Sequence, residues 1–322
     1  MQTSQQTPLR KSKKLKPWQV APYVFISPFF ILFILFGLFP LLFSLYLSFF
    51  SLDTGAPIET MKYIGWDNFR YNFQEPLFWK AMWNTFYLAV ASGLPQHVVA
   101  IPLAYFIHTN IKKFRNVALA IYFFPFITST VVVGLIFSTM FSEQSGLING
   151  IIGLIHDHIP LLGSLMPDNN IQWLGGSGDL TKPVIAFEIF WRYLGWNTVM
   201  YMAGLQTIPA DLYEAAEMDG ATKFQQFWYI TIPLLRPMMF FAITLSVIGG
   251  LQLLEDPLIM VGKDGGQLNT GTTLAMYMLT VFRDWGYSGQ AAAASWMTFA
   301  VILVLVVVNN FVFKLTGSKE GM

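Results

Sequence analysis

An uncharged apolar run near the start of the chain limits most strongly what this sequence can fold into. The run FFILFILFGLFPLLFSLYLSFF lies within Tyr23–Phe50 and contains no Asp, Glu, Lys or Arg. About 20 apolar residues suffice for a helix to cross the hydrocarbon core of a bilayer. Because lipid offers no hydrogen bonds, such a stretch must satisfy its backbone groups internally, which a helix does. The run therefore predicts a membrane protein built from helices.

The composition points the same way. Hydrophobic residues make up 54% of the chain and charged residues only 11%, whereas soluble domains average about 25% charged residues. The net charge is +1, so nothing in the charge balance indicates a nucleic-acid partner. The chain has no cysteine, which excludes disulfides and thiolate metal sites.

The apolar stretches predict an all-α integral membrane protein with six transmembrane helices. We expect residues 1–16 to form a basic tail and residues 17–322 to form one membrane domain. The expected spans are Tyr23–Phe50, Trp83–Ile107, Val117–Phe141, Pro183–Leu205, Met238–Val261 and Ala291–Phe313. The connections between the spans carry aromatic, Gly and Pro residues and are expected to form partly ordered caps on the outer side.

Basic residues predict the orientation, because Lys and Arg accumulate in short cytoplasmic loops. The connections on one side are short and basic; the longer loops on the other side carry fewer basic residues. Both termini and the segment 212–237 are therefore expected in the cytoplasm. The basic residues of this side are Arg10, Lys11, Lys13, Lys14, Lys16, Lys112, Lys113, Arg115, Lys223, Arg236, Lys314 and Lys319.

Segment 212–237, LYEAAEMDGATKFQQFWYITIPLLRP, is a patterned polar stretch between two apolar runs. Its first part has an apolar and an acidic face at helical spacing, and Asp219-Gly220 is a typical helix stop. A second amphipathic piece with Phe224, Phe227 and Trp228 on one side follows, and we expect Pro233 and Pro237 to end it. The pattern predicts a helix, a glycine turn and a second helix at the inner membrane surface.

Two functions fit this helical segment. It can anchor the loop at the membrane surface, or it can dock another protein. The small side chains of Ala215 and Ala216 favour docking, because they allow close approach where a lipid anchor would use larger apolar groups.

The spacing of this segment also resembles a known family. Glu214-Ala215-Ala216, then Gly220, Ile230 and Ile232-Pro233 match the EAA loop of bacterial ATP-binding-cassette importer permeases, with Ile232 where the family pattern has Leu. The flanks LQTIPADLYEAAEMDGA and ITIPLLRP are similar to the carbohydrate-uptake members, and so are the first and last spans. The likeness covers nearly the whole chain and is greatest to permeases of the type of the maltose importer's larger membrane subunit.

This resemblance implies a permease subunit of an ATP-driven sugar importer in the bacterial cytoplasmic membrane. Its partners would be a second homologous permease, two ATPase subunits and an extracytoplasmic solute-binding protein. The EAA loop would dock on the ATPase, with coupling residues Glu214, Ala215, Ala216, Gly220, Ile230 and Pro233. The chain contains no GxxxxGK[ST] segment. It is therefore expected not to be an enzyme and to hold no cofactor, with ATP and magnesium bound by the partner subunits.

Charged residues within the predicted spans indicate function, because they are costly in a membrane. Glu188 and Arg192 are four residues apart on one helical face and can pair. Glu255 and Asp256 lie at a similar depth in the outer half of the fifth span. With the aromatic and amide groups nearby, these charges could line a water-filled cavity suited to a sugar, or they could be structural.

The resemblance to the maltose-type permease indicates which residues would contact the sugar. By their position relative to the EAA loop, FWRYLGWNTVM and GLQLLEDPLIM correspond to the stretches that hold the sugar in the maltose-type permease. This implies substrate contacts by Trp191, Tyr193, Trp196, Leu251, Gln252 and Glu255. Glu255 stands where the relative has an amide, and Arg192 where it has an apolar residue.

Other functions require features that we do not find in the sequence. His97, His108, His156 and His158 do not form a metal-binding pattern, and no nucleophile–base arrangement is apparent. The remaining alternatives are a stand-alone secondary carrier or channel, which would work without ATP, and a membrane-embedded enzyme.

Overall fold

The computed structural model describes residues 17–111, 113–158 and 171–317. Regular structure in this part is almost entirely helical. Its sheet is one antiparallel pair, β1 (Phe50–Ser51) with β2 (Lys62–Tyr63). The predicted basic tail 1–16, Lys112 and the residues after 317 lie outside the described residues.

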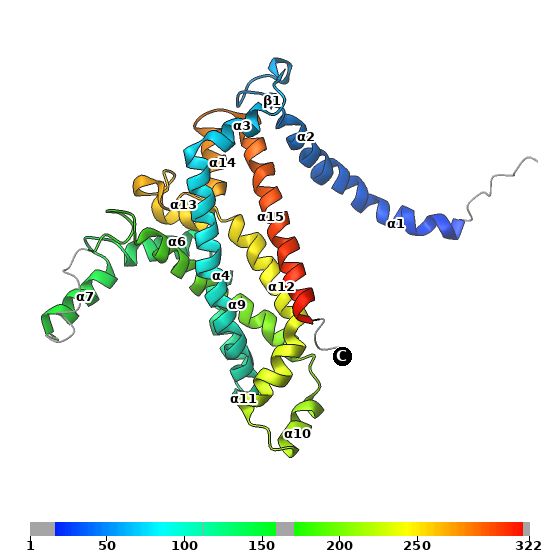
Figure 1. Ribbon diagram of the computed structural model, residues 1–322, viewed down its shortest axis with the longest axis vertical. Coiled ribbons are helices and arrows are strands. Elements are labelled where there is room, and N and C mark those ends of the chain that lie inside the picture. Colours follow the sequence, from blue (N-terminus) through cyan, green and yellow to red (C-terminus); the bar gives the residue numbers. More distant parts are fainter. Residues whose placement is uncertain (1–16, 112, 159–170, 318–322) are drawn as a thin grey trace, which may run out of the picture.

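The first predicted span forms an arm that leaves the rest of the protein (Figure 1). It consists of α1 (Pro17–Phe33), a π-helical turn (Ile34–Leu38) and α2 (Phe39–Leu47). None of its most apolar window is buried in the protein. The arm meets the bundle at its C-terminal end, where α2 packs against α15 (Ser288–Gly317) and Trp296 Nε1 donates to Ser44 Oγ at 3.2 Å. Just beyond α2 the Asn68 amide donates to the carbonyl oxygens of Ser48 at 2.9 Å and Phe50 at 2.8 Å.

Two long helices, α4 (Pro76–Asn110) and α9 (Thr181–Leu205), form the centre of the bundle. α12 (Ile232–Leu251) and α15 (Ser288–Gly317) pack beside them (Figure 1). α5 (Arg115–Ile127) lies directly against α9 at Gly195. A Cβ at Gly195 would lie 1.8 Å from the carbonyl oxygen of Tyr122, so only glycine permits this approach.

Among the described residues, four helices are long and apolar enough to cross a membrane: Ala21–Leu47, Pro76–Asn110, Lys223–Leu251 and Ser288–Lys314. A broken pair of helices, α5 and α6 (Thr130–Met140), is a candidate for a fifth span. The predicted fourth span corresponds to α9. This helix has 25 residues, or about 37 Å at 1.5 Å per residue, but its buried polar groups lower its hydropathy.

The third predicted span, Val117–Phe141, is not one continuous helix. α5 and α6 are bent by 87° relative to each other at the break. Thr128 and Ser129 there adopt extended backbone conformations, with ψ values of 148° and 128°. Hydroxyl side chains of this kind compete for backbone hydrogen bonds and favour helix ends over helix interiors.

The fifth span also differs from the prediction. Helix runs without interruption from α11 (Lys223–Gln226) through a π-helical turn (Phe227–Thr231) into α12, so Pro233 and Pro237 do not end the second amphipathic piece. Pro233 is tolerated because it lies in the first turn of α12, directly after the π-helical turn. α12 then ends at Leu251, and a separate helix, α13 (Glu255–Val261), follows the non-helical residues 252–254.

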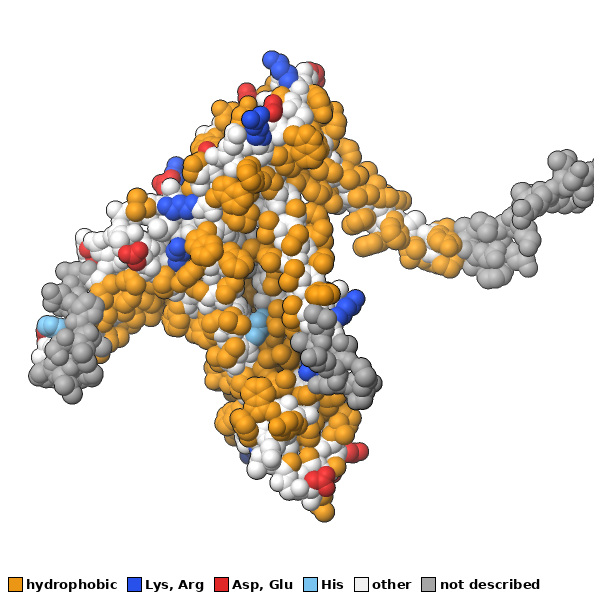
Figure 2. All heavy atoms as spheres, viewed as in Figure 1, with side chains coloured by type: hydrophobic (Ala, Val, Ile, Leu, Met, Phe, Trp, Pro, Cys, Tyr) orange, Lys and Arg blue, Asp and Glu red, His pale blue; other side chains and the backbone are white. Residues whose placement is uncertain are grey.

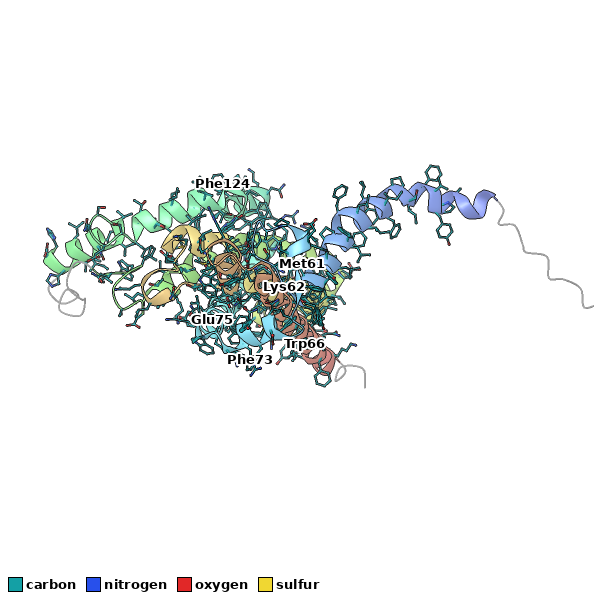
Figure 3. All side chains as sticks on the ribbon, turned by 90° about the horizontal axis from the view of Figure 1, so that it is seen from above. Met61, Lys62, Trp66, Phe73, Glu75 and Phe124 are labelled. Carbon is teal, nitrogen blue, oxygen red and sulfur yellow. The ribbon has the colours of Figure 1, made fainter. Side chains whose placement is uncertain are left out.

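Short elements cap the bundle at the end opposite the elbow between α10 (Ala210–Met218) and α11 (Figure 1). Figure 3 looks down on this cap, where Lys62, Trp66 and Glu75 lie over the bundle and the arm points away from it. In Figure 2 the visible side of the bundle and the arm are mainly hydrophobic, as lipid contact requires. The capping and peripheral elements are η2 (Ile58–Thr60), α3 (Asp67–Gln74), α7 (Leu147–His158), η4 (Gln267–Asn269) and α14 (Leu274–Arg283).

Candidate coupling loop and translocation site

Two helix-ending motifs build a sharp elbow between α10 (Ala210–Met218) and α11. Gly220 adopts φ +81°, and the bonds Ala221 N to Ala216 O (2.8 Å) and Gly220 N to Glu217 O (3.0 Å) form a Schellman motif. Two residues later Thr222 and Gln225 form a reciprocal capping box that starts α11. The predicted helix, glycine turn and second helix are therefore present.

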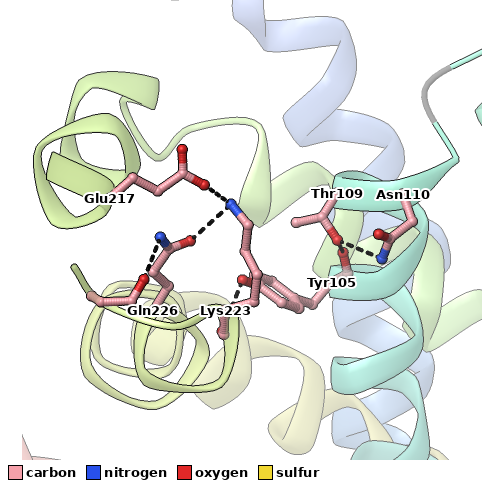
Figure 4. A network of polar contacts seen from close by, with 7 residues as sticks. Tyr105, Thr109, Asn110, Glu217, Lys223 and Gln226 are labelled. Atoms are coloured by element: carbon pink, nitrogen blue, oxygen red, sulfur yellow. Dashed lines mark hydrogen bonds and ion pairs between the residues drawn. The ribbon is translucent and has the colours of Figure 1, made fainter.

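Two hydrogen bonds tie the elbow to the bundle. The hydroxyls of Tyr213 and Thr231 are hydrogen-bonded at 2.8 Å, and the Tyr105 hydroxyl of α4 donates to the Lys223 carbonyl at 3.2 Å. Burial raises the pKa of the Tyr213 hydroxyl above its ordinary value. Lys223 also forms an ion pair with Glu217 across the elbow (Figure 4). This pair is largely exposed and contributes little to stability. The partly buried contact between Tyr213 and Thr231 holds α10 against the helix that continues into α12.

α10 presents an uncovered surface. None of its residues is buried, and Met218 is 88% exposed. The predicted coupling residues Glu214 and Ala215 are exposed, and Ala216 is half-buried. Gly220 lies at the tip of the elbow, whereas Ile230 lies in the π-helical turn and Pro233 in the first turn of α12. The first four of these residues thus share one projecting element.

Two of the predicted sugar contacts lie together. Tyr193 and Trp196 of α9 line a cavity of about 80 Å³ between α4, α9 and α12. Trp196 stacks on Phe126 of α5 with ring centroids 4.7 Å apart, and Tyr193 meets the same ring edge-on at 5.4 Å. The aromatic wall is thus held by α5, and the polar residues Ser92 and Gln96 of α4 complete the lining.

The other predicted contacts lie elsewhere. Trp191 packs against Phe137 of α6, with ring centroids 5.5 Å apart. Leu251 is buried and lines a different, apolar groove between α4, α12 and α15. Gln252 and Glu255 are exposed at the break between α12 and α13. The structure therefore brings together only Tyr193 and Trp196 around one cavity.

The intramembrane charges pair differently from the expectation that Glu188 can pair with Arg192. Arg192 forms a buried ion pair with Asp256 of α13 and donates a second hydrogen bond to the Thr130 hydroxyl of α6. Glu188 is completely buried, and neither of its carboxylate oxygens has a hydrogen-bond partner in the described part of the chain. The helix break brings Asp256 to the guanidinium, an arrangement that four-residue spacing along α9 could not reveal.

Sequence reasoning missed two buried polar contacts between α4 and α9. Asn197 donates to the Gln96 side-chain oxygen at 2.9 Å, and the Tyr201 hydroxyl lies 2.8 Å from Nδ1 of His97. Polar residues in an apolar span were the available signal. Across the described ranges, no group of three or more His, Asp or Glu side chains could hold a metal ion.

A bundle of long apolar helices identifies an integral membrane protein, and the known proteins that it resembles define its family. Residues 100–317 match the family of binding-protein-dependent transport system inner membrane components. The chain is 31% identical over 306 residues to the arabinooligosaccharides transport system permease protein AraP of Bacillus subtilis, covering 94% of this chain and 90% of the relative. It is 29% identical to the lactose transport system permease protein LacF of Rhizobium radiobacter, covering 92% and 94%.

The fold also matches a solved transporter. A chain of a bacterial alginate ABC transporter, in complex with an alginate pentasaccharide-bound periplasmic protein, superimposes with a TM-score of 0.77 at 23% identity and covers 92% of this chain and 95% of that chain. The protein belongs to the binding-protein-dependent transport system inner membrane component family. It is a membrane-spanning permease subunit of an ABC importer, and hydrolysis of ATP lies in separate subunits.

Proposed function

We propose that the protein imports a sugar or oligosaccharide delivered by an extracytoplasmic binding protein. The cavity beside Tyr193 and Trp196 carries this proposal, because aromatic faces stack on sugar C–H surfaces and the lining also carries the Ser246 hydroxyl. Ser92 and Gln96 add polar groups to the lining, but their donors already bond to Leu88 and Ile189 within the bundle. The names of the relatives, which refer to arabino-oligosaccharides and lactose, support the same substrate class.

A second homologous permease completes the pathway. The cavity of about 80 Å³ is smaller than the roughly 300–1,000 Å³ of typical ligand pockets, so one chain encloses only part of a sugar site. The arm supports the same partner, because none of its most apolar window is buried in this chain, so most of its surface is available for another subunit. The remaining candidate contacts, Trp191, Leu251, Gln252 and Glu255, stay predictions for a pathway that the partner would close.

The elbow is the proposed docking element for one of the two ATPase subunits. In this view Glu214 contacts the ATPase, Ala215 and Ala216 permit close approach, and Gly220 makes the turn. Ile230 and Pro233 connect the elbow to α12. Support comes from the uncovered surface of α10 and from the attachment of the elbow to α4 and α12. Through this attachment, movement of the ATPase subunit would be transmitted to the bundle. ATP and magnesium would be bound by those partners.

The proposed topology has six spans, with α9 as the fourth and the broken pair α5–α6 as the third. The protein would lie in the bacterial cytoplasmic membrane with both termini and the elbow in the cytoplasm. Labelling of single cysteines introduced at Lys223 and Lys62 tests this directly, since the chain has no native cysteine. In intact cells an impermeant thiol reagent should label the position at Lys62 and spare the one at Lys223; the reverse would contradict this orientation.

Uptake by the purified assembly tests the transport proposal. The chain should co-purify with an ATPase subunit, and vesicles containing the assembly should accumulate a labelled oligosaccharide only with ATP and a binding protein. Arabinotriose and lactose are suitable probes, given the names of the relatives. Accumulation of either sugar by this chain alone would instead favour a secondary carrier.

Replacing Trp196 by alanine should weaken sugar-dependent stimulation of ATPase activity by about 30-fold or more, because an aromatic anchor contributes about 2 kcal/mol or more to recognition. Trp196→Phe keeps an aromatic face and should retain most of the stimulation. The control is Trp83→Ala on α4, where the indole is 61% exposed and does not line the cavity. Full stimulation in Trp196→Ala would exclude this cavity as the sugar site.

A further inference from the structure

Two short helices, α6 and α13, each follow a break within a predicted span and lie side by side in the structure. α6 follows the break at residues 128–129, α13 follows the break at residues 252–254, and the two helices pack against each other. Their contact is close: a Cβ at Gly134 of α6 would lie 2.8 Å from Cγ2 of Ile259 of α13. α6 and α13 therefore behave as one packed unit, joined to the rest of the chain through the two breaks.

One charged side chain, beside apolar contacts such as that of Phe137 with Trp191, links this unit to the central helix. Nη1 of Arg192 on α9 donates to Asp256, in the first turn of α13, and Nη2 donates to Thr130, the first residue of α6. The Arg192 and Asp256 side chains are 9% and 6% exposed. A planar guanidinium can hold two acceptors in a fixed relative orientation, which a lysine ammonium cannot do.

The break before α13 is also held from the opposite side. The Thr273 hydroxyl, at the start of α14, donates to the Leu253 carbonyl at 2.6 Å. The next backbone N–H, of Leu274, donates to the Thr85 hydroxyl of α4 at 2.8 Å. Residues 252–254 are thus fixed between α9 on one side and α14 with α4 on the other.

Stability alone does not account for this ion pair. Burying two charges costs desolvation energy, and well-packed apolar residues often replace such pairs without loss of stability. Apolar side chains would not set a defined angle between α9 and the two helices α6 and α13. This angle sets the position of Leu253, which lines the candidate sugar cavity together with Tyr193 and Trp196.

We propose that Arg192 is a positioning residue that fixes the α6–α13 unit against α9 and thereby holds one wall of the translocation pathway in place. The unit can then move only together with α9, the helix that leads into the elbow. The link to a sugar rests on the proposed function, whereas the link between the helices does not.

The test uses the complete transporter in nanodiscs, with spin labels on cysteines introduced at exposed positions Thr139 of α6 and Val90 of α4. Because the chain lacks native cysteines, labelling is specific. Arg192→Met should broaden the distance distribution and lower uptake by about tenfold or more, since it leaves Asp256 buried without its partner. Thr130→Val keeps the ion pair and should broaden the distribution only partly, and Arg192→Lys should restore part of the order.

The matched control is Lys182→Met, which removes a cation from the same helix near the Tyr87 ring and leaves both breaks untouched. It should give the wild-type distribution and wild-type uptake. A narrow, unchanged distribution in Arg192→Met would overturn the proposal, even if the complex becomes less stable to heat. A broadened distribution with normal uptake would also overturn it. If the unsubstituted transporter takes up no sugar while the measured distances change as described, the proposed sugar substrate would be wrong. The positioning role of Arg192 would stand.

Discussion

Replacing Glu214 by lysine is expected to abolish ATP-driven uptake without unfolding the bundle. Glu214 is exposed on α10, which has no buried residue, so the substitution disturbs no packing within the chain. Removing one partner of an interfacial charge contact costs about 2–5 kcal/mol, which is roughly a 30-fold or larger loss of affinity. Uptake into vesicles and co-purification of the ATPase subunit both measure the effect.

Glu59→Lys is the control for this reversal of charge, because Glu59 is also exposed but lies in the cap at the opposite end of the bundle. It should leave ATPase association unchanged. Gly220→Pro should act like Glu214→Lys, since proline cannot adopt the positive φ of the elbow. If ATPase association and uptake both survive Glu214→Lys and Gly220→Pro, the elbow is not the coupling element.

The second large effect is expected from adding a single methyl group at Gly195. The new Cβ would lie 1.8 Å from the Tyr122 carbonyl oxygen, and a backbone atom cannot turn aside as a side chain can. Overpacking costs about 1–3 kcal/mol, occasionally more, and we expect the upper end because α5 and α9 must separate. Unfolding of the purified subunit assembly by denaturing detergent would reveal a lower midpoint for Gly195→Ala.

Gly249→Ala provides the comparison for this effect. Gly249 also lies in an apolar helix, α12, but nothing approaches within 4 Å of a Cβ placed there. The same chemical change should therefore be neutral or stabilising by up to about 1 kcal/mol through helix propensity. Equal destabilisation by both substitutions would show that glycine flexibility, and not close helix contact, determines stability.

Much of the fold could be predicted from local sequence signals. Apolar length predicts the arm, α4 and α15, and the pair Asp219-Gly220 predicts the end of α10. The capping box at Thr222 and Gln225 was not predicted, although the sequence carries its signal, a Thr and a Gln three residues apart. These features depend on neighbouring residues only, so no knowledge of the tertiary structure is needed to find them.

The helix breaks were not predicted, for a physical reason. Apolar runs such as 117–141 satisfy the length criterion for a span whether or not the helix bends. Thr128 and Ser129 are weak signals by themselves, and they end α5 because α6 finds a packing partner in α13. At the other end of the same unit, the polar residues near α13 were read as part of a continuous span.

The candidate site was predicted in outline only. Tyr193 and Trp196 are three residues apart on α9 and line one cavity, as helical periodicity allows. Trp191 precedes Tyr193 by two residues, which places it on another face of the helix. The position of Arg192 within an apolar stretch could indicate that it needs a counter-charge. Which carboxylate supplies it depends on the break before α13, so sequence reasoning favoured Glu188 over Asp256.

The folding of the bundle and its assembly with other subunits depend on different parts of the chain, because the arm takes part mainly in assembly. None of its most apolar window is buried in its own bundle, and its attachment lies at one end, where α2 packs on α15 and Asn68 bonds to Ser48. Substitutions along the middle of the arm should therefore leave the bundle folded while changing which other polypeptides it recruits. The arm would then determine which partner subunit is bound. It could be exchanged between related subunits without changes to the rest of the bundle.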